Sequence, residues 1–294
     1  MALLIFSLPF ITHAVEVVPI GQTIKPEGAE EGSGGGSRPA RKRPSVSTIA
    51  AGKSFSIESA QILSSALNQE GETVYFRASE DVGSTSRPVI HKGAIAKGIL
   101  VGVDKNKKNG KLMVRLDSIE AVDGDSIKIK GDLKIEEQGA PAVLTVGKIF
   151  SATLDEKAIV KGKHKKEAFP NFDKNIPANI QTSGLKVSLA KGSIKGKVEI
   201  ILEGGQGIKA EDINPDSVVI YRINNQWLPE EILAIGGKSK VGDRNKDGNN
   251  DLGLQFDTLN FIKYQASGNN TLYLKAKLSN GSEIGASGRT SIEY

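Results

Sequence analysis

"GKLMVRLDSIEAVDGDSIKIKG", residues 110–131, is the stretch that indicates the fold most clearly. Leu112 and Val114 begin an alternation of apolar and polar residues, and "SIKIK" repeats it after the turn. A period of two places alternate side chains on one face of a strand. Asp123 and Gly124 form a pair that favours the positive φ of a tight hairpin turn. The stretch therefore predicts a β-hairpin with one buried face.

The same period continues through the rest of the first half of the chain. "ETVYFRA" places Val74, Phe76 and Ala78 on one face of a strand. "SAQILSSALN" is the one helix candidate in this half, and it lacks a clear cap. The charge run "KGKHKKE" is typical of a solvated boundary, so we place the end of the first domain there.

Short strands also account for the second half, residues 173–294. "DLGLQF" alternates Leu252, Leu254 and Phe256, and "KGKVEIILEGG" has a similar apolar period. "TLYLKAKLSNGSEIGA" indicates a hairpin with an Asn-Gly turn. Many short strands separated by such turns predict a β-sandwich.

Composition narrows the classes of function. The 294 residues suffice for about two domains. The net charge of +5 is spread along the chain and forms no concentrated basic stripe, which argues against nucleic-acid binding. The chain has no cysteine, so disulfides, thiolate zinc sites and cysteine nucleophiles are excluded. Its three histidines are too dispersed to suggest a histidine metal site or a Ser-His-Asp triad.

The chain begins with the apolar run "MALLIFSLPFITHAVEV". Ala14 closes a small-residue cleavage site, so residues 1–14 are predicted to be a signal peptide, although the usual basic start is missing. A transmembrane helix and a buried first strand are the alternatives; Pro9 and the short run argue against the helix. Residues 15–45 are predicted to be a disordered linker because Gly, Ser, Pro and mixed charges leave little to bury. We therefore expect a secreted, periplasmic or cell-surface protein without a stable membrane span in the mature chain.

"DRNKDGNND", residues 243–251, matches the pattern D-x-[DN]-x-D-G-x-x-D. Calcium takes 6–8 oxygen ligands in a flexible geometry, and alternate short polar side chains can turn their oxygens toward one centre. Gly248 permits the sharp bend that this path needs. The predicted metal ligands are Asp243, Asn245, Asp247, Asn249 (through its carbonyl) and Asp251 (directly or through a water).

Three carboxylates around one divalent ion would leave the site with a formal charge of −1, whereas the empty loop would be loosened by their repulsion. Arg244 and Lys246 are expected to project outward. Leu254 stands where an EF-hand has a bidentate Glu, which argues against a helix-loop-helix sensor. The alternative is a polar turn without an ion, of the kind that "DKNKKNG", residues 104–110, suggests.

The loop resembles the calcium loops of integrin-type β-propeller repeats and of dockerin-like segments. "INPDSVVI", "DRNKDGNNDLGLQF" and "SNGSEIGASG" together resemble C-terminal β-sandwich domains of secreted bacterial proteins. "GETVYFRASEDV", "VIHKGAIAKGILVGV", the opening hairpin and "VGKIFSATLDEKAIV" resemble small β-barrel-like domains of exported bacterial proteins. The resemblances imply an all-β protein with a β-barrel-like domain over residues 46–165 and a calcium-binding β-sandwich over 173–294.

We expect a non-enzymatic protein whose calcium-stabilised domain binds or displays an envelope protein or glycan. No catalytic residue is predicted, because the acidic pairs at 155–156 and 230–231 are sequence neighbours that face opposite sides of a strand. The alternative is a carbohydrate-binding module or an accessory domain of a secreted hydrolase. Exposure of Trp227 and Tyr221 on one flat face would favour that alternative.

Overall fold

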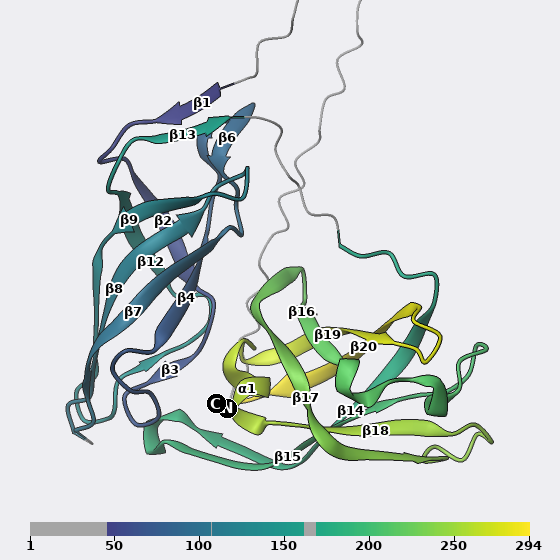
Figure 1. Cartoon of the computed structure of the whole chain (residues 1–294). Coiled ribbons are helices and arrows are strands. Elements are labelled where there is room, and N and C mark those ends of the chain that lie inside the picture. The colour runs from purple at the N-terminus through teal and green to yellow at the C-terminus, as the bar shows by residue number, and fades with distance from the viewer. Residues whose placement is uncertain (1–45, 107, 162–168) are drawn as a thin grey trace, which may run out of the picture. The chain divides into compact units, whose positions relative to one another are not determined.

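The structure is a computed structural model that describes residues 46–106, 108–161 and 169–294 (Figure 1). These residues belong to one compact unit, and their regular structure is almost entirely β, as predicted. The predicted signal peptide (1–14) and linker (15–45) lie outside the described residues.

Six strands of the first domain close into a barrel. They are β2 (Ser54–Ser59), β4 (Thr73–Ala78), β7 (Ile95–Asp104), β8 (Lys111–Glu120), β9 (Ser126–Lys130) and β12 (Ile149–Leu154). The order is β8-β7-β4-β2-β12-β9, and the ring closes because β9 pairs with both β12 and β8. The barrel-like prediction is therefore confirmed.

Shorter pairs extend this barrel. β1 (Val46–Ile49) pairs with β13 (Ala158–Lys161), β3 (Leu63–Ser64) with β11 (Val143–Leu144), β5 (Val82–Ser84) with β6 (Arg87–Ile90), and β10 (Asp132–Glu136) with β8. No helix forms over residues 59–68, the helix candidate that lacked a clear cap.

The predicted alternation in the first barrel is confirmed. Val74, Phe76, Leu112 and Val114 are fully buried in its core, and Leu116, Ile119, Ile127 and Ile129 of the hairpin at residues 110–131 are buried with them, whereas Met113 on the opposite face is exposed. Asn109-Gly110, before β8, is also a residue pair that favours the positive φ of a tight turn, but it behaves differently from Asp123-Gly124. Gly110 does not have positive φ, and a Cβ there would collide with the backbone of residues 141–142, so this glycine permits a close chain approach.

Seven strands form the second barrel, in the order β14-β15-β18-β17-β16-β19-β20. They are β14 (Asn175–Ser188), β15 (Ser193–Leu202), β16 (Val219–Ile223), β17 (Gln226–Gly242), β18 (Asp251–Phe256), β19 (Gly268–Lys277) and β20 (Glu283–Ile292). The helices of this domain are η1 (Leu189–Lys191), η2 (Ala210–Asp212), η3 (Pro215–Ser217) and α1 (Thr258–Lys263). None of the helices in the described part of the chain is long and apolar enough to cross a membrane.

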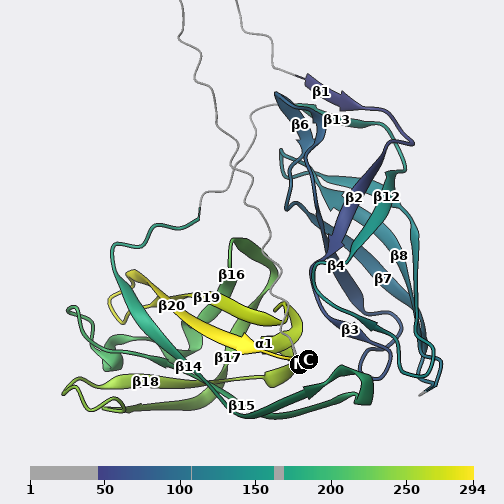
Figure 2. The ribbon, with the colours of Figure 1, turned by 180° about the vertical axis from the view of Figure 1, so that it is seen from behind.

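The β-sandwich predicted for residues 173–294 is wrong, because two long strands join what would be separate sheets. β14 pairs antiparallel with β15 and, through its first residues, parallel with β20 (Figure 2). β17 pairs with β16 along its first half and with β18 along its second half. Its register shifts between Ala234 and Ser239, where Gly237 has φ +70°. Glycines that interrupt strands often mark such barrel corners.

The strand pattern within the second domain was nevertheless correct. Leu252, Leu254 and Phe256 are buried in its core, together with alternate residues of β15 and β19. The sequence analysis did not predict α1. This short helix begins after Asp257, whose carboxylate accepts a hydrogen bond from the backbone N–H of Asn260.

Strand β4 is buried on both faces. Tyr75 and Arg77, which point away from the first core, are 7% and 2% exposed. The Tyr75 hydroxyl donates to Glu230 Oε1 at 2.8 Å, and Arg77 Nη2 donates to the carbonyl of Trp227 at 2.6 Å. Burial, aided by the hydrogen bond and charge of Glu230, raises the pKa of Tyr75 to about 12, so this hydroxyl remains a donor at neutral pH. Residues of the two barrels therefore share a polar interface.

Tyr75→Phe removes the donor to Glu230 and keeps the ring. We expect the free energy of unfolding to fall by about 1 kcal/mol, because the bond involves a charged acceptor that is partly exposed. Urea denaturation measures the change. Tyr273→Phe is the control, because among the described residues the hydroxyl hydrogen bonds are those of Tyr75, Tyr264 and Tyr294, and the ring of Tyr273 lies against Arg222. Equal losses in both variants would contradict the role of the Tyr75 hydroxyl.

Candidate functional site

The acidic loop lies between β17 and β18 of the second barrel. Gly242 pairs with Asp251, so residues 243–250 form the hairpin connection, and β18 resumes immediately, as the sequence predicted. Asn250 donates a side-chain hydrogen bond to Glu211, in the middle of η2. The loop is therefore attached to a neighbouring segment as well as to its own strands.

Asp243 organises the loop from its first position. Its Oδ1 accepts a hydrogen bond from the backbone N–H of Asp247, and its Oδ2 accepts one from Gly248, both at 3.1 Å. These bonds wind the chain into a compact turn around one side chain. Gly248 has φ +89° and Lys246 has φ +63°, so the turn uses left-handed backbone at both places. The bend predicted at Gly248 is confirmed.

Asn245 and Asp247 lie on the same turn and are exposed. Asn245 Oδ1 accepts from the backbone N–H of Asp247 at 3.1 Å, and its Nδ2 donates to Asp247 Oδ2 at 3.1 Å. Asp247 Oδ1 accepts from the backbone N–H of Asn249 at 2.8 Å. This backbone hydrogen bond is the main cause that lowers the pKa of Asp247, and contacts with Asn245 and Asn249 lower it further. The carboxylate is thus held in its ionised form.

Asp251 has a different environment from the other predicted ligands. It is fully buried, its Oδ1 accepts from the backbone N–H of Gly204 at 3.2 Å, and its Oδ2 accepts from that of Arg244 at 3.0 Å. Both oxygens therefore already serve the fold, by holding the loop to the segment after β15. Sequence reasoning could not identify this role, because Gly204 is distant along the chain.

Arg244 does not project outward as predicted, whereas Lys246 is exposed. Arg244 Nη1 lies 2.7 Å from Glu199 Oε1 on β15, and both side chains are largely buried. Its guanidinium lies over Gly253, where a Cβ would come within 2.7 Å of Arg244 Cζ. A glycine in the middle of β18 was the available signal for this close approach.

The oxygen atoms of the predicted ligands match the requirements of a calcium ion only in part. Asp243, Asn245 and Asp247 supply hard oxygens on one exposed turn, and a carboxylate oxygen that accepts one hydrogen bond retains a further lone pair. Asp251 is committed to the fold. Within the residues that the structure describes, no three His, Cys, Asp or Glu side chains are gathered so that they could hold a metal. Ion binding would therefore require the exposed side chains to reorient.

The aromatic residues named in the sequence analysis do not make a flat exposed platform. Tyr221 is buried, and its ring is tilted by 51° from that of the half-buried Trp227, at a centroid distance of 5.4 Å. Phe169 packs on Trp227 at 5.3 Å, and Arg222 covers the ring of Tyr273. These aromatic side chains therefore pack against one another at the surface.

The neighbouring acids of β17 contact different partners. Glu230 accepts hydrogen bonds from the hydroxyls of Tyr75 and Tyr264, whereas Glu231 forms an ion pair with Lys275.

Comparisons of the chain with protein-family models, curated proteins and solved structures found no match. Interpretation of the loop therefore depends on its own residues and geometry.

Asp251→Ala would leave the backbone N–H groups of Gly204 and Arg244 without their acceptor. We expect it to lower the free energy of unfolding by about 2 to 3 kcal/mol, because both groups are partly buried. Asp247→Ala is the matched control: its exposed partners can turn to water, so a change within about 0.5 kcal/mol is expected. Urea denaturation in the presence of a chelator measures both. Similar losses would contradict the distinction between the two carboxylates.

Proposed function

We propose that residues 243–251 bind a calcium ion that stabilises the second barrel. The observation that carries the proposal is the position of the Asp243 carboxylate, which accepts hydrogen bonds from the backbone N–H groups of Asp247 and Gly248. This arrangement supports calcium binding because it already places the oxygen donors at positions one, three and five on a single turn. Flexible oxygen-rich loops of this kind suit calcium better than magnesium, which demands a stricter geometry.

The proposed ion has a structural role. When bound, it would neutralise the exposed carboxylates of Asp243 and Asp247. Asn249 would contribute its carbonyl, and Asn245 its amide oxygen. Asp251 would keep its hydrogen bonds to Gly204 and Arg244 and would act on the ion through a water. Since the loop connects β17 with β18, ordering it would favour the folded barrel by mass action.

The wider proposal is a non-enzymatic exported protein in which this calcium-stabilised barrel binds or displays an envelope protein or glycan. Export is inferred from the sequence of residues 1–14, and tethering from that of residues 15–45. A carbohydrate-binding module is less well supported, because Tyr221 is buried and the ring of Trp227 is covered in part by Phe169.

Differential scanning calorimetry with and without calcium tests the site. Calcium at about a hundredfold excess over its Kd should stabilise the protein by about 2.7 kcal/mol, which corresponds to a rise in Tm of about 5 to 10 °C. The double variant Asp243→Ala with Asp247→Ala should lose this shift.

Asp104→Asn is the matched control. Asp104 lies in the separate polar turn at residues 104–110, where its carboxylate accepts a hydrogen bond from the backbone N–H of Asn106. The variant should keep the full calcium shift. A wild-type Tm that is the same in calcium and in chelator would refute the proposed site, and a shift that survives the double variant would place the ion elsewhere.

A further inference from the structure

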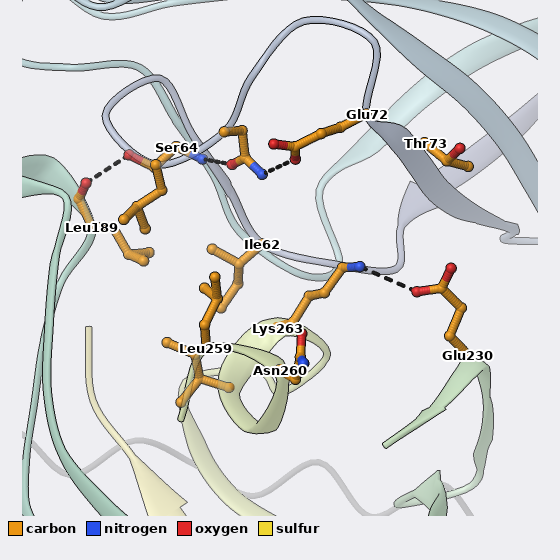
Figure 3. A pocket seen from close by; sticks show the side chains of 12 residues that line it. Ile62, Ser64, Glu72, Thr73, Leu189, Glu230, Leu259, Asn260 and Lys263 are labelled. Carbon is orange, nitrogen blue, oxygen red and sulfur yellow. Dashed lines mark hydrogen bonds and ion pairs between the residues drawn. The ribbon is translucent and has the colours of Figure 1, made fainter. Parts of the chain in front are cut away.

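A second candidate site is a cavity of about 390 Å³ within the compact unit (Figure 3). It is lined by the segment around β3 on one side and by residues of η1, β17 and α1 on the other. This volume lies in the range of small-molecule sites. The cavity contains none of the predicted calcium ligands, so the inference is independent of the proposed function.

The cavity walls are held by hydrogen bonds in the structure described. The backbone N–H of Ile62 donates to the carbonyl of Lys263 at 2.8 Å, and Ser64 Oγ donates to the carbonyl of Leu189 at 2.6 Å. Each bond joins a residue of the first barrel to one of the second. The site is therefore pre-formed while the two barrels keep this interface, which limits the ordering that a ligand would have to cause.

One side of the cavity is apolar. Figure 3 shows Ile62, Leu189 and Leu259 gathered away from the carboxylates of Glu72 and Glu230. Ile62 and Leu189 are buried, whereas Leu259 is 47% exposed and so is available for further burial. A hydrocarbon chain placed against these side chains would be removed from water, which is favourable for each methylene.

The charged side of the cavity has a net charge of −1. Lys263 Nζ lies 3.3 Å from Glu230 Oε2, so these two charges neutralise each other. Glu72 accepts hydrogen bonds from the side chain of Asn68 and the backbone of Gln69, both at 2.7 Å. Both donors are neutral, and no lysine or arginine in residues 46–106, 108–161 and 169–294 forms an ion pair with Glu72. A cationic ligand would therefore neutralise the charged side of the cavity.

We propose that this cavity binds a small aliphatic ammonium ion, with its hydrocarbon chain against Ile62, Leu189 and Leu259 and its cationic head at Glu72. An alkyl carboxylate fits less well. Its head would meet the negative Glu72, while Lys263 is already paired with Glu230. A neutral alkyl alcohol would gain the apolar contacts without the ion pair.

Titration of the full chain with octylammonium, octan-1-ol and octanoate, followed by isothermal calorimetry below the concentration at which these probes self-associate, tests the proposal. Octylammonium should bind most tightly and octanoate most weakly. Shortening the chain from octyl to hexyl should weaken binding by about fourfold per methylene lost. Octanoate binding as tight as octylammonium would overturn the proposal.

Two variants test separately the contributions of the ligand's cationic group and of its hydrocarbon chain. Glu72→Gln should weaken octylammonium about fivefold and leave octan-1-ol unchanged, as expected for a partly exposed ion pair. Leu259→Ser should weaken both probes several-fold. The controls are Glu70→Gln, which alters a carboxylate of the same loop that accepts from Val103, and Leu233→Ser, an exposed leucine on β17. Unchanged octylammonium binding in Glu72→Gln, or equal effects of a variant and its control, would refute the assigned site.

Discussion

The burial of β4 on both of its faces is the constraint on which the relation between the two barrels depends. A strand of a small barrel ordinarily turns alternate residues to solvent. Here Val74 and Phe76 fill the first core, while Tyr75 and Arg77 are covered as well. Burial lowers the pKa of Arg77 to about 10, although the charge of Glu58 raises it. A buried guanidinium is costly unless it is hydrogen-bonded, so its bond to the second barrel disfavours separation of the barrels.

The sequence predicted this strand but only one of its faces. Alternation reports which residues lie on one side, and Val74 and Phe76 were assigned correctly from it. Tyr75 and Arg77 are amphipathic side chains that suit a solvated face equally well. Their burial results from partners about 150 residues away along the chain, in β17. No local period carries that information, because an interface depends on which surfaces meet.

Closure of the second barrel could not be predicted from the alternation of its strands either. Strands of a sandwich and of a barrel have the same alternation, and the two folds differ in whether the edge strands find partners. The decisive pairing is parallel, between the start of β14 and the first half of β20. The glycines within "AIGGKSK" were a local signal for the corner in β17. The loop was predicted better, because Asp243 and Gly248 act within a few residues. The roles of Asp251 and Arg244 were not predicted, because Gly204 and Glu199, which they contact, lie on distant segments.

Glu230 links the interface with the cavity. Burial opposes its ionisation, but the hydroxyls of Tyr75 and Tyr264 and the charge of Lys263 outweigh that effect and lower its pKa. The same carboxylate thus fixes Tyr75 at the interface and neutralises Lys263 beside the cavity. Since the cavity needs residues of both barrels, a ligand that binds there must favour the docked arrangement by its differential affinity. Ligand binding and barrel docking would then be reciprocal, so a change that loosens one would weaken the other.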